Sequence, residues 1–312
     1  MITESYQLWE DREDVKLYTF LHSAGMATQL KKPRPAIIIC PGGAYFECGH
    51  NNGDGDPIAY SFCADGYQSF VLEYSVAARA PQEKTLFPAQ LLDLGKAILL
   101  IREHAEEWCV DVDKISVIGF SAGGHLCGML GTTWHTDLLS GYFHVDASLF
   151  KPLCVLSIYG VLDYVRAVEV AKPEEDFFTH VLGSKRPDVE LLKQHSPVYL
   201  VNENTPPFFI AAARDDFLVP AIESIDMAQA LHKAKRPYEL HIFENGDHGF
   251  CLGRDPYEPW KLESTHACAA WVSLAKTFLM HQISPETAEN EKEVFGKLAA
   301  SMPNPAVQSK EE

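Results

Sequence analysis

Ile115-Ser-Val-Ile-Gly-Phe-Ser-Ala-Gly-Gly124 is the stretch that decides the fold. The residues before Ser121 are mostly apolar and β-branched, which predicts a buried strand. Ser121 itself stands between two glycines, each two residues away, in a G-x-S-x-G pattern. This pattern is typical of a sharp turn between a strand and a helix, where larger side chains at the glycine positions would collide. Such a turn exposes the serine hydroxyl, so Ser121 is the candidate nucleophile.

Strand and helix patterns alternate on both sides of this stretch. Short apolar runs predict strands at residues 36–40, 68–74, 153–159, 207–213 and 238–243, and an exposed or antiparallel edge strand at 15–21. Helices are predicted at residues 57–64, 88–108, 221–234 and 263–281, and a polar loop at 134–148. Such alternation implies an α/β fold with a mostly parallel sheet covered by helices on both faces. On sheets of this kind, chemistry gathers beyond the carboxyl ends of the strands.

Length and composition favour one catalytic domain. The chain has 312 residues, of which 46% are hydrophobic and 22% charged, as in soluble globular proteins. The domain is expected to cover residues 1–283. Between about 160 and 204 the periodicity fades and prolines mix with charges, which predicts an insertion or partial lid. Residues 284–312 are expected to form an acidic tail, since they carry few large apolar side chains.

Charge limits the partners. A formal net charge of −17 argues against nucleic acid or an anionic membrane surface, because both need a basic face. We therefore expect a small-molecule substrate, and a homo-oligomer is compatible with this composition. No apolar run approaches the ~20 residues that span a bilayer, and the first residues do not resemble a signal peptide. A cytoplasmic location is the expectation.

Neither metal binding nor disulfide bonding is expected. The eight cysteines are scattered, form no C-x-x-C pair and often lie in apolar runs, which favours buried free thiols. The sequence contains no H-E-x-x-H and no cysteine or histidine pairs at the spacing of metal ligands. Serine chemistry also needs no cofactor.

A serine hydroxyl becomes a good nucleophile only when a base takes its proton, and an acid must hold that base in the right tautomer. The chain order expected on this fold is Ser, Asp or Glu, then His. The histidines that follow a candidate acid are His232, His241, His248, His266 and His281. Only His248 stands in a glycine-flanked loop after a strand, so it is the candidate base. His125, one helical turn beyond Ser121, is expected to pack inside its helix.

Two adjacent carboxylates compete for the role of the acid. Asp215 and Asp216 directly follow the strand predicted before them. One is expected to orient His248, and the other to cap the next helix or to pair with Arg214. Asp163, which follows an earlier strand, is a third candidate.

The negative oxygen of a tetrahedral intermediate needs backbone donors. One expected donor is the amide of Ala122, directly after the nucleophile. The other is expected in Pro41-Gly-Gly-Ala-Tyr45, where glycine lets the main chain approach a substrate; Gly43 is the candidate. Ala44 and Tyr45 are expected to contact the substrate, and the bulk of Tyr45 predicts a cramped acyl pocket.

Together these residues resemble the α/β-hydrolases of the bacterial acetyl-esterase and acetyl xylan esterase type, with hormone-sensitive-lipase-like and dienelactone-hydrolase-like relatives. The resemblance covers about residues 36–281. Its motifs are residues 41–45, 66–67 with 72–74, 119–125, 216–220 and 241–250. In that family the acid stands two residues before Val-Pro and the histidine follows an Ile-Phe strand, which implies Asp216 and His248. The family also commonly has a histidine without a catalytic role where His125 stands.

The resemblance implies a serine esterase on an α/β-hydrolase fold that removes acetyl groups from small esters or xylan-derived sugars through an acyl-enzyme. A dienelactone-hydrolase-like or peptidase-like enzyme is the alternative within this fold, and a non-catalytic binding protein is the alternative outside catalysis. Two residues depart from the family pattern. Ala44 replaces a common third glycine, and Ser75 replaces a common arginine, for which Arg79 is the candidate substitute.

Overall fold

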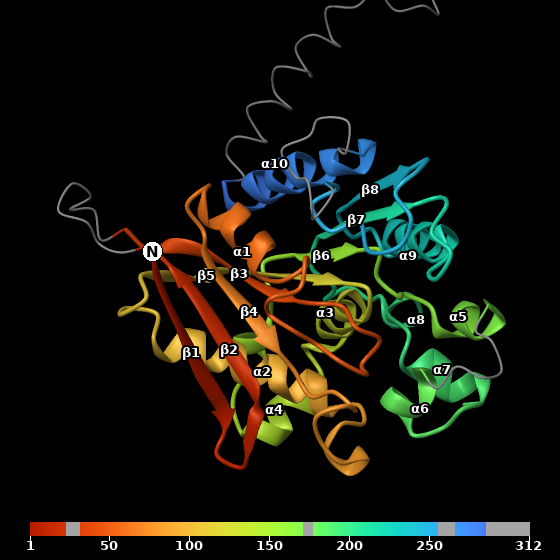
Figure 1. Ribbon diagram of the computed structural model, residues 1–312, viewed down its shortest axis with the longest axis horizontal. Coiled ribbons are helices and arrows are strands. Elements are labelled where there is room, and N and C mark those ends of the chain that lie inside the picture. Colours follow the sequence, from red (N-terminus) through yellow and green to blue (C-terminus); the bar gives the residue numbers. More distant parts are fainter. Residues whose placement is uncertain (23–31, 171–176, 255–265, 285–312) are drawn as a thin grey trace, which may run out of the picture.

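The computed structural model describes residues 1–22, 32–170, 177–254 and 266–284, and in these ranges the chain builds one sheet of eight strands (Figure 1). The strands are β1 (Ile2–Trp9), β2 (Arg12–Leu21), β3 (Arg34–Cys40), β4 (Gln68–Glu73), β5 (Val110–Phe120), β6 (Val155–Ile158), β7 (Phe208–Ala213) and β8 (Tyr238–Phe243). They lie in the order β1-β2-β4-β3-β5-β6-β7-β8. The β1–β2 and β2–β4 pairs are antiparallel and the other pairs are parallel, which confirms the predicted mostly parallel sheet.

Helices cover both faces of this sheet. Helices α1 (Asp56–Cys63) and α10 (Trp271–Ile283) lie on one face, and α2 (Ala89–Glu103), α3 (Ala122–Thr133) and α9 (Ala221–Lys233) lie on the other (Figure 1). Along β3 the side chains alternate between the two resulting cores. Ile37 and Ile39 join the core under α1 and α10, and Ile38 and Cys40 join the core under α2 and α3. A continuous apolar run is therefore required, because neither face of β3 meets water.

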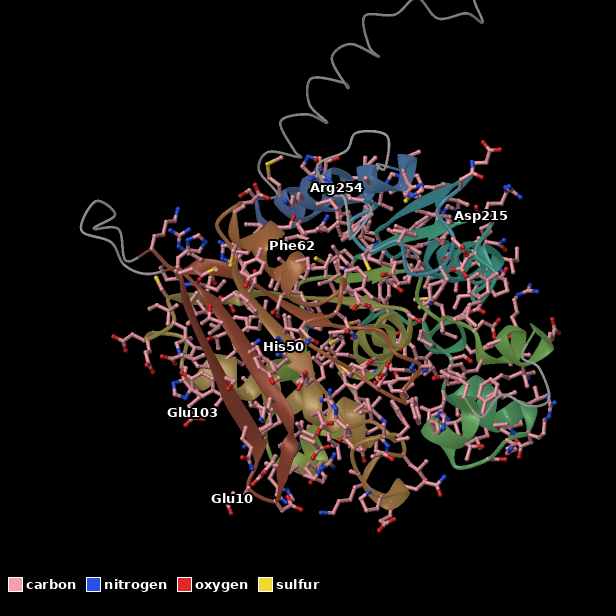
Figure 2. The ribbon with its side chains drawn as sticks, viewed as in Figure 1. Glu10, His50, Phe62, Glu103, Asp215 and Arg254 are labelled. Carbon is pink, nitrogen blue, oxygen red and sulfur yellow. The ribbon has the colours of Figure 1, made fainter. Side chains whose placement is uncertain are left out.

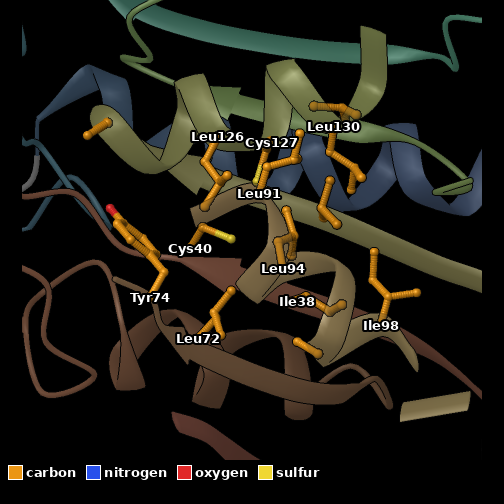
Figure 3. Packing of buried hydrophobic residues seen from close by; sticks show 14 of the residues in the cluster. Ile38, Cys40, Leu72, Tyr74, Leu91, Leu94, Ile98, Leu126, Cys127 and Leu130 are labelled. Atoms are coloured by element: carbon orange, nitrogen blue, oxygen red, sulfur yellow. The ribbon is translucent and has the colours of Figure 1, made fainter. Parts of the chain in front are cut away.

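The larger core holds α3, the helix that follows Ser121, against the sheet. Leu91, Leu94 and Ile98 recur every three or four residues along α2 and are buried together with residues of α3 and of β3 and β4 (Figure 3). Burying each such side chain contributes ~2 kcal/mol relative to leaving it exposed. The position of α3, and with it the start of the helix after Ser121, is thus fixed by apolar packing.

The prediction of an edge strand at residues 15–21 is wrong in one respect. These residues lie in β2, which is the second strand, and the edge is formed by β1, paired from Ile2 opposite Leu21 to Trp9 opposite Arg12. Most of β1 is exposed. Such a strand is held by backbone pairing rather than by a buried face, so its sequence carries no clear apolar periodicity.

The polar loop predicted at residues 134–148 contains a helix, α4 (Asp137–Phe143). Its signals are present in the sequence, because the Thr136 hydroxyl accepts a hydrogen bond from the N–H of Leu138 at the helix start, and Leu139 is buried against the core. Helix α2 also ends at Glu103, before the predicted end at residue 108. Short 3-10 turns complete the connections at Gln82–Lys84, Ala147–Phe150 and Ala267–Ala270.

The segment between β6 and β7 forms short helices. They are α5 (Tyr164–Val170), α6 (Phe177–Leu182), α7 (Val189–Gln194) and α8 (Pro197–Leu200). Residues 171–176 of this segment, the predicted helix start at 263–265 and the predicted tail beyond residue 284 lie outside the described residues. Every helix in the described ranges is too short or too polar to cross a bilayer.

Candidate active site

Ser121 occupies the turn between β5 and α3 that its sequence predicts. Its backbone has φ 53° and ψ −119°, a conformation that costs an ordinary residue about 1–3 kcal/mol. The flanking glycines make the turn sterically possible. A methyl group on Gly119 would lie 1.9 Å from the carbonyl oxygen of Gly123, and one on Gly123 would lie 2.0 Å from the carbonyl oxygen of Cys40. Both positions therefore require glycine.

The structure brings Ser121, His248 and Asp216 together. His248 Nε2 lies 3.0 Å from Ser121 Oγ, and His248 Nδ1 lies 2.8 Å from Asp216 Oδ2. The three residues follow β5, β8 and β7, so all of them come from the carboxyl end of the sheet. The side chain of Asp216 is fully buried and that of His248 is 13% exposed. The hydrogen bonds thus run from a fully buried carboxylate through a nearly buried imidazole to the hydroxyl of Ser121, a residue that is 9% exposed.

The surroundings of Asp216 set the tautomer of His248. The second carboxylate oxygen, Oδ1, accepts hydrogen bonds from the N–H groups of Leu218 at 2.9 Å and Val219 at 2.8 Å. These donors fix the carboxylate with Oδ2 facing the imidazole. Because an ionised carboxylate only accepts, Nδ1 must carry the hydrogen and Nε2 is left to accept the proton of Ser121.

Asp215 braces the loop that carries His248. Its Oδ1 accepts hydrogen bonds from the N–H groups of Gly246 and Asp247, each at 3.0 Å. Both N–H groups lower the pKa of the Asp215 carboxyl, and that of Asp247 has the larger effect. The expectation that this carboxylate caps α9 is wrong, because α9 begins after Pro220 without a side-chain cap. The charge of Arg214, the alternative partner, also lowers the pKa of Asp215. Figure 2 labels Asp215 on the side of the molecule formed by β7, β8 and α9.

The loop after β3 has an unusual backbone. Gly43, Ala44 and Tyr45 have φ values of 130°, 53° and 58°, so three consecutive residues lie at positive φ. A methyl group on Gly43 would lie 2.0 Å from the carbonyl oxygen of Glu47. Ala44 and Tyr45 each pay about 1–2 kcal/mol for this conformation. Contacts with the surrounding structure must therefore hold the loop.

Three backbone N–H groups around Ser121 are free to bind an anion. Within the described residues, the N–H groups of Gly43, Ala44 and Ala122 donate to no other group. The N–H of Gly42, in contrast, donates to Asp54 Oδ2 at 2.8 Å. The candidate donors Gly43 and Ala122 are thus available near Ser121, and the amide of Ala44 adds a third.

Tyr45 does not line an open pocket. Its side chain has no exposed surface and its hydroxyl bonds to His125 Nδ1 at 2.7 Å. The expectation that its bulk narrows an acyl pocket is therefore wrong for the side chain, because the positive φ of Tyr45 turns it into the core and leaves only its backbone near the site.

His125 is buried in α3, as predicted, and uses both ring nitrogens. Nε2 lies 2.7 Å from the carbonyl oxygen of His195, and Nδ1 meets the Tyr45 hydroxyl. Burial lowers the pKa of His125 to about 3, so the ring is neutral at ordinary pH. Its Nε2–H must then donate to the His195 carbonyl, and Nδ1 must accept from Tyr45.

Asp163 lies away from His248. Its Oδ1 accepts from the N–H of Val165 at the start of α5, and its Oδ2 accepts from the Tyr199 hydroxyl at 3.3 Å. A buried acid that sequence reasoning missed, Glu223, accepts from the N–H groups of Leu162 and Asp163 at 2.9 and 3.1 Å. Burial raises the pKa of Glu223 to about 8. Both acids support the loop after β6.

Arg79 stands where the resemblance predicts a substitute for the missing arginine. It donates to the carbonyl oxygen of Cys48 and pairs with Glu73 at 3.0 Å. The N–H of Ser75 donates instead to Asp93 at 2.8 Å. Arg79 therefore supports the chain just beyond the loop after β3.

The structure describes all eight cysteines, and all are unpaired; six are buried, while Cys109 and Cys251 are partly exposed. In the described part of the chain no three histidine, cysteine or carboxylate side chains lie close enough together to hold a metal ion.

The sheet order, the helices on both faces and the strand–serine–helix turn define an α/β-hydrolase. The chain belongs to the BD-FAE family, whose model matches residues 25–231. The model of the dienelactone hydrolase family matches residues 183–282.

One relative is endo-1,4-beta-xylanase B of Butyrivibrio fibrisolvens, which is 28% identical over 77% of this chain and 35% of that protein. Another is acetylxylan esterase of Xylanibacter ruminicola, which is 28% identical over 70% of this chain and 41% of that protein. The chain thus spans less than half the length of these curated relatives. Among solved structures, the acetyl ester-xyloside bifunctional hydrolase of Caldicellulosiruptor lactoaceticus superposes with a TM-score of 0.70 at 29% identity, over 89% of this chain and 95% of that one.

Proposed function

We propose that the protein is a serine esterase that works through an acyl-enzyme. Ser121 attacks the carbonyl carbon of the ester while His248 takes its proton and later gives it to the leaving alcohol. Asp216 holds the imidazole and stabilises its positive charge. The observation that carries this proposal is the hydrogen-bonded chain from Asp216 through His248 to Ser121, with each atom in the order that the chemistry needs.

The free amides would stabilise the tetrahedral intermediate. The N–H of Ala122 follows the nucleophile directly, and those of Gly43 and Ala44 lie on the neighbouring loop. Negative charge develops on the carbonyl oxygen only as the reaction proceeds, so these donors lower the barrier rather than bind the substrate more tightly. Loss of one such donor raises a barrier by ~3 kcal/mol.

We further propose that the substrate carries an acetyl or similarly short acyl group on a sugar or small alcohol. Two relatives support this choice by their names, an acetylxylan esterase and an acetyl ester-xyloside hydrolase. The described helices between β6 and β7 are also short, from 4 to 7 residues each. They offer no long amphipathic pair of the kind that covers an extended acyl channel.

A series of p-nitrophenyl esters tests the acyl preference. We expect kcat/KM to be highest with acetate, lower with butyrate and very low with octanoate. An extended apolar tunnel would give the opposite trend, because each buried methylene contributes ~0.8 kcal/mol, or roughly fourfold in rate. An optimum at octanoate would overturn the short-acyl proposal and leave the roles of Ser121 and His248 intact.

The match to the dienelactone hydrolase family favours a second candidate, the opening of a small cyclic ester. This match covers only residues 183–282, which exclude Ser121. Dienelactone hydrolases also commonly carry a cysteine at the position of Ser121. Dienelactone and a peptide anilide belong in the same assay, and turnover of either above that of the acetate ester would replace the proposed substrate class.

Asp215→Asn is expected to be mild, with kcat within about threefold of the wild type, because an amide oxygen can still accept from Gly246 and Asp247. Asp215→Ala removes both hydrogen bonds and should lower kcat about tenfold. Steady-state kinetics with p-nitrophenyl acetate measures both variants. A loss of several thousandfold in Asp215→Asn would show that Asp215, and not Asp216, is the acid of the triad.

A further inference from the structure

Asp54 lies beside the nucleophile, although it comes from a glycine-rich loop before α1. Its Oδ2 accepts the hydrogen bond from Gly42 N at 2.8 Å. A methyl group on Gly42 would lie 3.0 Å from this same oxygen and 3.1 Å from Ser121 Cβ. The carboxylate and the serine therefore lie against the same small residue.

The loop that carries Asp54 also packs against the loop that carries His248. A methyl group on Gly53 would lie 2.9 Å from Cys251 Sγ, three residues beyond His248. Burial raises the pKa of the Asp54 carboxyl, against the opposing effects of the Gly42 N–H and of His248. Asp54 thus lies, partly buried, between the two loops that the proposed reaction uses.

The peptide group between Pro41 and Gly42 is held at both of its polar ends. Its N–H donates to Asp54, and its carbonyl oxygen accepts from the Tyr74 hydroxyl at 2.6 Å. Tyr74 is fully buried next to Cys40, at the end of β3 (Figure 3). A peptide plane fixed from two opposite sides cannot rotate unless one of these hydrogen bonds breaks.

This peptide directly precedes the strained turn. Gly43, Ala44 and Tyr45 follow it at positive φ, and the free N–H groups of Gly43 and Ala44 lie in that turn. A rotation of the Pro41–Gly42 peptide would change the direction of the next N–H along the chain. The carboxylate also occupies the Gly42 N–H, which excludes this group from binding an oxyanion.

We propose that Asp54 is a positioning residue of the active site, which fixes the Pro41–Gly42 peptide together with Tyr74 and thereby orients the Gly43 and Ala44 amides. The inference rests on the proposed function of these amides as oxyanion donors. The required property is a hydrogen-bond acceptor at this position, which an amide oxygen supplies as well as a carboxylate.

Two substitutions separate the acceptor from the charge. Asp54→Ala removes the acceptor and should lower kcat with p-nitrophenyl acetate roughly 100-fold, with KM within about threefold, because the affected donors act in the transition state. Asp54→Asn keeps an acceptor and should retain at least about a third of the wild-type kcat. Asp56→Ala is the matched control and should leave kcat unchanged, because Asp56, two residues after Asp54, contacts His50 instead of Gly42.

Wild-type kcat in Asp54→Ala, or an equally large loss in Asp54→Asn, would overturn the inference. If Asp54→Ala does not fold, Tyr74→Phe tests the same peptide from its other end and should lower kcat at least about tenfold; an unchanged kcat would also overturn it. When Asp54→Ala and Tyr74→Phe are combined, the loss of kcat should be smaller than the product of the two single losses, because both residues hold one peptide group.

The rate at which a fluorophosphonate labels Ser121 separates this inference from the proposed esterase function. The reagent reacts with an activated serine whatever the natural substrate is. If the wild type labels rapidly but hydrolyses no ester, the esterase proposal fails, while a roughly 100-fold slower labelling of Asp54→Ala still supports the positioning role. Equal labelling rates in the wild type and Asp54→Ala would reject that role.

Discussion

Ser121→Ala is expected to fold normally and to lose ester hydrolysis by roughly a millionfold, the scale seen when a serine nucleophile is removed from a triad. The hydroxyl that the substitution deletes is the atom that attacks the carbonyl carbon. Alanine is compatible with the turn, because the glycines at 119 and 123 rather than the serine make room for it. The melting temperature should stay within about 3 °C of the wild type.

Mass spectrometry after fluorophosphonate treatment gives the second readout. Wild-type protein should gain one adduct at Ser121, and Ser121→Ala should gain none. Ser116→Ala is the matched control, because Ser116 is a buried serine in β5, the strand before Ser121, and its hydroxyl meets Cys154 rather than His248. Substantial hydrolysis by Ser121→Ala would contradict the mechanism. Absence of both hydrolysis and labelling in the wild type would favour the alternative of a non-catalytic binding protein.

Asp216→Asn is expected to lower kcat by about 10,000-fold, and the structure supplies the reason. The N–H groups of Leu218 and Val219 need an oxygen acceptor, so the new amide will turn its oxygen toward them and its NH₂ toward His248. The imidazole must then accept at Nδ1 and carry its hydrogen on Nε2. That tautomer cannot take the proton of Ser121.

Steady-state kinetics at the pH of maximal wild-type activity measures this loss. The combination of Asp216→Asn with His248→Ala should be little worse than His248→Ala alone, since the members of a triad act as a unit. Asp163→Asn is the matched control and should stay within about threefold of the wild type, because Asp163 contacts α5 and Tyr199 rather than His248. A larger loss in Asp163→Asn than in Asp216→Asn would move the acid to the loop after β6.

The elements that carry the candidate site were predictable because each has a local signal. The two glycines around Ser121 indicate the turn, and the glycines around His248 indicate the histidine loop. The choice between Asp215 and Asp216 was not local, since it depends on which carboxylate meets the N–H groups of the histidine loop. The residues alone leave this choice open, and the resemblance implies Asp216, whose carboxylate the structure places against His248.

The errors have more than one physical origin, and the first is a contact between segments that are distant in sequence. The position of Tyr45 in the chain predicts a place beside the substrate, but its hydroxyl bonds to His125, 80 residues away. The sequence does not indicate that Asp54 packs beside the loop after β3, because a polar, glycine-rich loop has no periodicity that predicts packing. Strand β1 lacks an apolar periodicity too, because its backbone pairing with β2 leaves most of its side chains exposed.

The ring of His125 also has a consequence for how the substrate side of this protein can change. It links Tyr45 in the loop after β3 to the carbonyl of His195 at the far end of the segment between β6 and β7. The ring is neutral and uses both nitrogens, so neither link can be exchanged for another partner without leaving a buried polar atom unpaired. Any variation of that segment must therefore still bring a backbone carbonyl group to the same point beside His125.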